Sequence, residues 1–125
     1  MTENEISYKI RGAIFNVYNT LGPGLLESVY QSALEYELKN EGLKVKKEVP
    51  LPVYYNDVKL EVGFRLDLLV EDKVIIELKS VESIADVHHK QVLTYLKLSN
   101  LKLGILVNFN TDNIVEGIFR KVNNL

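Results

Sequence analysis

The sequence predicts one α/β domain in which a mixed β-sheet is flanked by helices. Three observations favour this fold class. Two segments with helical spacing of apolar residues come first, and alternating, strand-like segments follow them. A third helical segment then precedes a short, fully apolar strand. The expected order is helix, helix, strand, strand, strand, helix, strand and a short tail. With 125 residues the chain is large enough for a single core, so we expect one domain over residues 1–125.

Two amphipathic helices are expected at the start. Thr2 and Glu5 have the capping-box pattern, and the apolar residues after them recur at helical spacing, which predicts a helix over residues 3–20. The Gly-Pro-Gly segment at residues 22–24 ends it, because proline cannot continue a helix. A second helix is predicted over residues 25–41.

Strands are expected in the middle of the chain. Residues 45–55 alternate, and Pro50 and Pro52 place this strand near a sheet edge because proline donates no ladder hydrogen bond. Residues 58–70 form a long predicted strand, and residues 73–81 form the next.

The last third of the chain returns to helical spacing. A third helix begins between Ser83 and Asp86 and ends at Ser99. A strand is predicted over residues 101–109, and its middle, residues 103–107, is apolar throughout, which suits a central strand buried on both faces. The tail over residues 114–122 is a weak strand or a short helix.

Composition limits the classes of function. The chain has no cysteine, which excludes disulfides and thiolate metal sites and favours the cytoplasm. No apolar run approaches the roughly 18 residues of a membrane span, and the polar, acidic start is unlike a signal peptide. The net charge of −2 argues against a protein that coats nucleic acid by charge alone. An enzyme whose acidic centre is neutralised by a metal ion remains compatible with it.

Three ionisable residues interrupt two apolar strands that meet at a short charged turn: Asp67, Glu77 and Lys79. An unpaired charge inside a strand is costly, so these residues need an explanation. Two carboxylates are ligands that a hard cation such as Mg²⁺ prefers. A lysine two residues after Glu77 lies on the same face and can orient water or stabilise charge on a phosphate. The alternative is a partly buried ion-pair ladder of these residues with Arg65.

The two carboxylates converge only if the turn between the strands has three residues or the strands contain a bulge. If Val70 pairs with Val74, the loop has three residues, Asp67 faces Glu77, and Arg65 faces Lys79. A regular two-residue hairpin would put the carboxylates on opposite faces. Strict alternation also predicts one shared face for Phe64, Leu66, Leu68 and Val70.

Residues from two helices are candidates to complete the site. Gln91 and Tyr95 are four residues apart on one side of the third helix, and His88 shares that side; an ordinary amphipathic helix edge is the alternative. Glu27 lies in the first turn of the second helix, where the helix dipole alone favours a carboxylate. Its functional interpretation is an additional metal ligand.

These residues resemble a known group of enzymes. Asp67, then Glu77-Leu78-Lys79, then a helix with Gln91 and Tyr95, is similar to the PD-(D/E)XK nuclease superfamily, whose restriction-endonuclease-like core has the same order of elements. Residues 21–30, Leu-Gly-Pro-Gly-Leu-Leu-Glu-Ser-Val-Tyr, and residues 77–81 resemble the GxxExxR family within it. The resemblance covers roughly residues 5–120.

The resemblance implies a role for each candidate. Asp67 and Glu77 would be metal ligands, Lys79 the catalytic lysine, Glu27 the helical acid and Gln91 an auxiliary residue. The implied cofactor is Mg²⁺ or Mn²⁺. Leu66 stands where the superfamily name has proline, which carries no chemistry. Tyr30 stands where the narrower family's name has arginine, which leaves that role unassigned.

The sequence leaves three functions to compare. The first is a metal-dependent nuclease that hydrolyses phosphodiester bonds, with DNA preferred over RNA. The second is a catalytically inactive module that binds nucleic acid or protein on a nuclease scaffold. The third is a structural domain with an ion-pair ladder. So short a nuclease-like chain would need a partner to hold both strands of a duplex, and a homodimer would supply one.

Overall fold

The N-terminal helices form as their apolar spacing predicts. The computed structural model describes residues 1–125 and has α1 over Glu3–Leu21 and α2 over Glu27–Asn40, which confirms both helices. Thr2 caps α1, because its hydroxyl accepts from the Glu5 N–H while the Glu5 carboxylate accepts from the Thr2 N–H. The Gly22-Pro23-Gly24 turn separates the helices, and both of its glycines have a positive φ.

Five strands form one mixed sheet in the order β1-β4-β5-β6-β7. Neighbouring strands are antiparallel except β5 and β6, which are parallel. The bounds are β1 Val45–Leu51, β4 Phe64–Val70, β5 Val74–Lys79, β6 Leu103–Asn108 and β7 Ile118–Val122. This confirms the α/β class and the central position of the apolar strand, and it places β1 at an edge, as its prolines predict.

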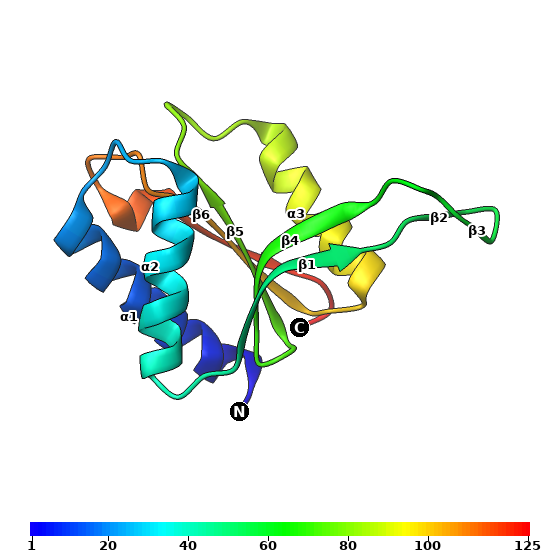
Figure 1. The fold of residues 1–125 in the computed structure, drawn as a ribbon, viewed down its shortest axis with the longest axis horizontal. Helices are drawn as coiled ribbons and strands as arrows, with labels where there is room; N and C mark the ends of the chain where they lie inside the picture. Colours follow the sequence, from blue (N-terminus) through cyan, green and yellow to red (C-terminus); the bar gives the residue numbers. More distant parts are fainter.

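Helices cover both faces of this sheet (Figure 1). α1 and α2 pack on one face, over the larger apolar core that includes Leu68, Ile76 and Ile105. The third helix, α3 over Asp86–Ser99, packs on the other face through Tyr95 and Leu96. Gly104 lies on this second face, and a Cβ at this position would come within 2.7 Å of the Val92 side chain of α3.

The predicted long strand over residues 58–70 is wrong, because it is divided into two strands. Val58–Lys59 forms β3, which pairs with β2 at Tyr54–Tyr55, and β4 starts only at Phe64. β1 ends at Leu51, opposite Phe64, and the next residue, Pro52, has no N–H for a ladder hydrogen bond. The small β2–β3 hairpin therefore extends beyond the main sheet (Figure 1).

The tail contains both structures that its sequence left open. A short 3₁₀ helix, η1, spans Ile114–Gly117, and β7 follows it directly and pairs with β6. None of the helices combines the length and the apolar character needed to cross a lipid bilayer.

Candidate active site

The turn between β4 and β5 sets the register of the site. Val70 pairs with Val74, so the loop has three residues, as the convergence of the carboxylates requires. Glu71 and Asp72 both adopt a φ of 54°, in the left-handed region. Acidic residues tolerate that region better than β-branched ones, because their short polar side chains bond locally.

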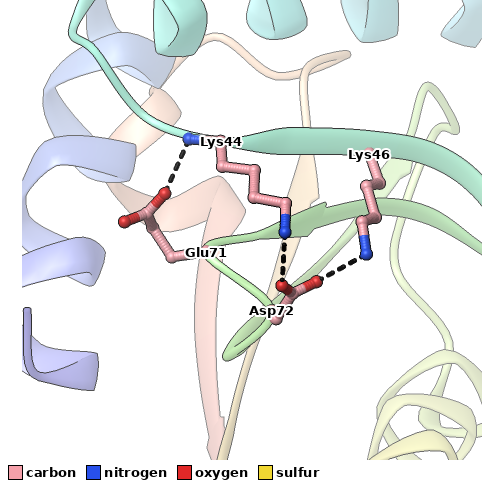
Figure 2. Close-up of polar contacts among 4 residues, drawn as sticks. All are labelled: Lys44, Lys46, Glu71 and Asp72. Atoms are coloured by element: carbon pink, nitrogen blue, oxygen red, sulfur yellow. Dashed lines mark hydrogen bonds and ion pairs between the residues drawn. The ribbon is translucent and has the colours of Figure 1, made fainter.

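Charged contacts hold this turn against the start of β1 (Figure 2). The Asp72 carboxylate lies 2.8 Å from Lys44 Nζ and 2.9 Å from Lys46 Nζ. The Glu71 carboxylate accepts from the Lys44 N–H at 2.7 Å, and the Glu71 N–H donates to the Lys44 carbonyl at 2.8 Å. Hydrogen bonds from the two lysines lower the pKa of Asp72 to about 2. We call these four residues, Lys44, Lys46, Glu71 and Asp72, the turn clamp.

The sheet opens at the candidate carboxylates. Regular pairing of β4 with β5 ends at Leu68 and Ile76, so the expected pairing of Arg65 with Lys79 is not formed. Beyond that pair, the two strands are joined by hydrogen bonds from backbone N–H groups to side-chain carboxylates instead of by backbone–backbone hydrogen bonds. The Asp67 N–H donates to Glu77 Oε1 at 3.3 Å, and the Leu78 N–H donates to Asp67 Oδ2 at 2.8 Å. The two carboxyl groups therefore lie together between the strands.

The same position interrupts the pairing of β4 with β1. The register omits only the pair of Glu48 with Asp67, and Glu48 has a φ of 50°. Leu68 belongs to the core under α1 and α2, whereas Leu66 packs under α3. The prediction that Phe64 and Leu66 share a face with Leu68 and Val70 is therefore wrong. Strict alternation fails because a left-handed residue in one strand rotates the ladder, as in a β-bulge.

Burial makes Glu77 the most perturbed acid of the chain. Its exposed fraction is 7%, and Asp67 beside it is half-buried. Burial, the charge of Asp67 and a hydrogen bond with Asp67 raise the pKa of Glu77 to about 9. The ion pairs of the structure involve Lys39, Lys44 and Lys46, so the alternative of a ladder with Arg65 and Lys79 is not formed.

Lys79 ends β5 on the same face as Glu77. Its register partner is Asn108 of β6, and its carbonyl accepts from the Phe109 N–H at 3.0 Å. Asn108 is buried and holds the chain that leaves β5, since it bonds both the N–H and the carbonyl of Val81. The backbone that carries Lys79 is therefore held from the neighbouring strand.

One side of α3 covers the carboxylates. Tyr95 is buried, and burial together with the charges of Glu77 and Asp67 raises its pKa to about 12. Gln91 contacts the Tyr95 side chain and partly counteracts the rise in the pKa of Tyr95. Gln91 therefore lies on the side of α3 that covers the carboxylates. His88 instead caps α3, because its Nδ1 accepts from the Ala85 N–H at 3.1 Å.

Glu27 lies apart from the carboxylate pair. It is exposed in the first turn of α2, and no three acidic, histidine or cysteine side chains lie close enough to share a metal ion. The loop before α2 does reach the site, since Ser80 Oγ donates to the Leu25 carbonyl at 2.5 Å. Glu27 is thus near the end of β5 but not grouped with Asp67 and Glu77.

Tyr30 organises that loop. Its hydroxyl donates to the Gly22 carbonyl at 2.6 Å and accepts from the Leu25 N–H at 3.1 Å. Its ring stacks on Phe109 with centroids 4.4 Å apart. Sequence reasoning left Tyr30 without a role and missed Ser80 and Asn108, because their partners are distant in the chain. The only sign in the sequence that Tyr30 has a special role was its position, because it stands where the name of the GxxExxR family has arginine.

The donor set fits a hard divalent cation. Two carboxyl groups in contact, one of them buried, repel each other when both are ionised, and a cation between them would remove that repulsion. Oxygen atoms from Asp67 and Glu77 are the ligand type that Mg²⁺ and Mn²⁺ accept. Lys79, Gln91 and Tyr95 then surround a polar, partly covered centre at an opening in the sheet.

Comparison with known proteins agrees with this arrangement. The family model described as PD-(D/E)XK nuclease superfamily matches residues 4–121, which is nearly the whole chain. No curated protein and no solved structure matches the sequence. The acidic pair and the following lysine lie on two neighbouring strands of the mixed sheet, β4 and β5. The chain belongs to the PD-(D/E)XK nuclease superfamily.

Proposed function

We propose that this protein is a metal-dependent nuclease of the GxxExxR family that hydrolyses phosphodiester bonds, with DNA preferred over RNA. The observation that carries the proposal is the contact between Asp67 and the buried Glu77 where β4 and β5 separate, with Lys79 two residues farther along β5. A stable fold has little reason to bury an acid against a second, half-buried acid without a cationic partner. The proposal treats residues 1–125 as one nuclease domain.

Asp67 and Glu77 would hold Mg²⁺ or Mn²⁺, and Glu27 would contribute through a water molecule from the neighbouring helix. When bound, the cation would polarise the phosphate and favour ionisation of a water molecule. Binding requires Glu77 to lose its proton, so its raised pKa makes metal affinity increase with pH.

The chain's own residues then assist hydrolysis. The Lys79 ammonium, on the same face as Glu77, stabilises the negative charge that grows on the phosphate oxygens. Gln91 orients the attacking water or a phosphate oxygen. A bond forms between the water oxygen and phosphorus, and the bond to the leaving sugar oxygen breaks. The water's proton passes to solvent, and the leaving oxygen takes up a proton from solvent to become a hydroxyl group.

Plasmid cleavage tests the proposal. Wild-type protein should nick or linearise DNA with Mg²⁺ or Mn²⁺ and not with EDTA, while Glu77→Ala should be inactive. Lys79→Met should lower the rate about 10²- to 10³-fold. It should leave the Mn²⁺ affinity, measured by calorimetry, nearly unchanged, because Lys79 is not a ligand.

Glu61→Gln is the matched control, since Glu61 is an exposed acid outside the site. Equal cleavage by wild type and Glu77→Ala would reject the enzyme. Nucleic-acid binding that survives both EDTA and Glu77→Ala, without cleavage, would support the inactive binding module instead.

A further inference from the structure

A cleft of about 610 Å³ lies beside the candidate active site. Asn108 of β6 and Phe119 of β7 contribute to its base, and His89 of α3 contributes to one side. Asn108 is the register partner of Lys79, and Phe119 pairs with Leu106, which in turn pairs with Glu77. Directly paired residues point to the same side of a sheet, so the cleft opens on the face that carries Glu77 and Lys79.

The distance between Lys79 and the cleft allows one nucleic-acid strand to contact both of them. β7 lies two strand spacings from β5, which is about 10 Å. Two or three nucleotides of a single strand span this distance, because successive nucleotides advance by about 3.4 Å along a helix axis and by more when the strand is extended. A strand with a phosphate at Lys79 would therefore bring a neighbouring nucleotide to the cleft.

The charges of the cleft disfavour a phosphate there. No lysine or arginine is among its lining residues, and three exposed acids surround it, namely Glu82, Asp112 and Glu116. Ser83 and Asn110 add neutral polar groups. These acids would repel an anion and accept hydrogen bonds from N–H donors. The volume lies within the usual range of small-molecule pockets.

The aromatic part of the cleft consists of two uncharged rings set nearly at right angles to each other. The rings of His89 and Phe119 meet edge to face with centroids 4.8 Å apart. Burial and the nearby Lys121 lower the pKa of His89, so its ring is neutral at physiological pH. Its Nδ1 is buried without a hydrogen-bond partner, which favours the tautomer with the proton on Nε2. Such rings are typical surfaces for stacked bases.

We propose that this cleft holds one nucleobase of the bound strand, next to the nucleotide whose phosphate lies at Lys79, and that it selects a base with an exocyclic amino group. Cytosine, adenine and guanine carry such a group and can donate it to the acids of the cleft. Thymine has only its N3–H as a donor, and the two carbonyl oxygens beside that N–H would be repelled by the same acids. This inference rests on the proposed function for its position relative to Lys79. It adds a specificity site that the metal-binding residues do not provide.

Nucleosides test the cleft separately from cleavage. In a ¹H–¹⁵N NMR titration without divalent ions, deoxycytidine should shift the amide signals of residues 108–112 and 116–119. Thymidine should bind at least fivefold more weakly. Ser83→Trp, at an exposed loop position that lines the cleft, should abolish these shifts by filling it. Ser32→Trp, at an exposed position on α2, is the matched control and should bind as wild type.

The two proposals fail in different ways. If deoxycytidine causes no shift in the cleft, or if Ser83→Trp leaves the shift intact, the base site is overturned even when the protein cuts plasmid DNA. If deoxycytidine binds there but no metal supports cleavage, the base site stands and the nuclease proposal fails. For an active protein, replacing a single deoxycytidine by an abasic nucleotide next to the cut bond should lower kcat/KM about tenfold.

Discussion

At the scale of single residues, the candidate site consists of two carboxyl groups at the point where the pairing of β4 with β5 ends. Asp67 and Glu77 each accept a backbone N–H from the opposite strand, so the strands remain joined where regular pairing has ended. The same bonds keep the acids close enough to repel each other when ionised. Burial and this repulsion raise the pKa of Glu77, and the raised pKa would connect stability to the proposed metal binding.

Glu77→Gln should stabilise the metal-free protein at pH 8. The folded pKa of about 9 exceeds the unfolded value near 4.5, so the wild-type contribution is complete below pH 4.5 and declines as the pH rises towards 9. Glutamine cannot ionise and escapes this loss. We expect a gain of roughly 4–5 kcal/mol in the free energy of unfolding at pH 8, and of only about 1 kcal/mol at pH 5.

Urea denaturation at both pH values, in EDTA, measures this difference. The same variant should lose the stabilisation that Mn²⁺ gives the wild type at pH 8, because it lacks one ligand. A Glu77→Gln protein that is less stable than wild type at pH 8 in EDTA would contradict the assigned pKa.

Secondary-structure elements carry the site through two supports that are distant from it in sequence. The turn clamp holds the β4–β5 hairpin against β1 and thereby keeps the register that brings Asp67 to Glu77. Tyr30 holds the loop before α2, and that loop accepts a hydrogen bond from Ser80, next to Lys79. Both supports are common hydrogen bonds and ion pairs, and we expect each of them to affect function because of where it lies in the fold.

Asp72→Asn should weaken the clamp while keeping the turn, since asparagine also adopts a left-handed φ. We expect Tm at pH 7 to fall by roughly 1–4 °C at low salt and by less in 1 M NaCl. Because the pKa of Asp72 lies below its ordinary value, the wild-type advantage should exist above about pH 4 and disappear towards pH 2. Asp57→Asn, at another left-handed turn residue without an ion pair, is the control for calorimetry. An equal loss in both variants would remove the clamp's role.

Tyr30→Phe should keep the stacking on Phe109 and remove only the hydroxyl. The Gly22 carbonyl and the Leu25 N–H then lose a partner, which should cost about 1–2 kcal/mol of unfolding free energy. In an active protein, kcat should fall more than KM rises, because Ser80 and Lys79 become less well positioned. Tyr36→Phe, on the exposed side of α2, should change neither quantity. Unchanged kcat in Tyr30→Phe would show that the loop does not position the site.

The molecule as a whole carries a net charge of −2 and an acidic cleft beside the carboxylate pair. Its attraction for nucleic acid must therefore come from local lysines and from bound cations. The homodimer stays a prediction, because a second active site is what a short chain would need to cut both strands of a duplex. Sedimentation velocity with and without duplex DNA would test it.

Duplex binding should depend on divalent ions more than on monovalent salt. In EDTA we expect weak binding, and Mn²⁺ should strengthen it at least tenfold because it neutralises Asp67 and Glu77. With Mn²⁺ present, the plot of log affinity against log salt should have a slope of about −2 to −3, which corresponds to few phosphate contacts. Fluorescence anisotropy measures both quantities, with Asp67→Asn as the variant that should lose the effect of Mn²⁺. A steep slope in EDTA would instead indicate a cationic binding surface.

Much of this fold was predictable because its local signals agree with one another. Helical spacing marked α1, α2 and α3, and the fully apolar segment marked the central strand β6. The three-residue turn was one of the two arrangements, with a bulge, that parity allows if the two carboxylates converge. The division of residues 58–70 was not predicted, because it depends on Pro52, just after β1, lying beside Gly63, just before β4. The change of face at Leu66 was missed for a similar reason, since it depends on Glu48.

By itself, the sequence determined the class of the fold, the acidic pair with its lysine, and the turn that can bring the pair together. These properties follow from periodicity and spacing, which are local. Tertiary structure alone decided that Glu77 is buried, that Asp67 bonds the backbone beside it, that Glu27 lies outside the pair, and that a cleft adjoins Lys79. Burial and charge proximity depend on which distant segments pack together, and no short stretch of sequence contains that information.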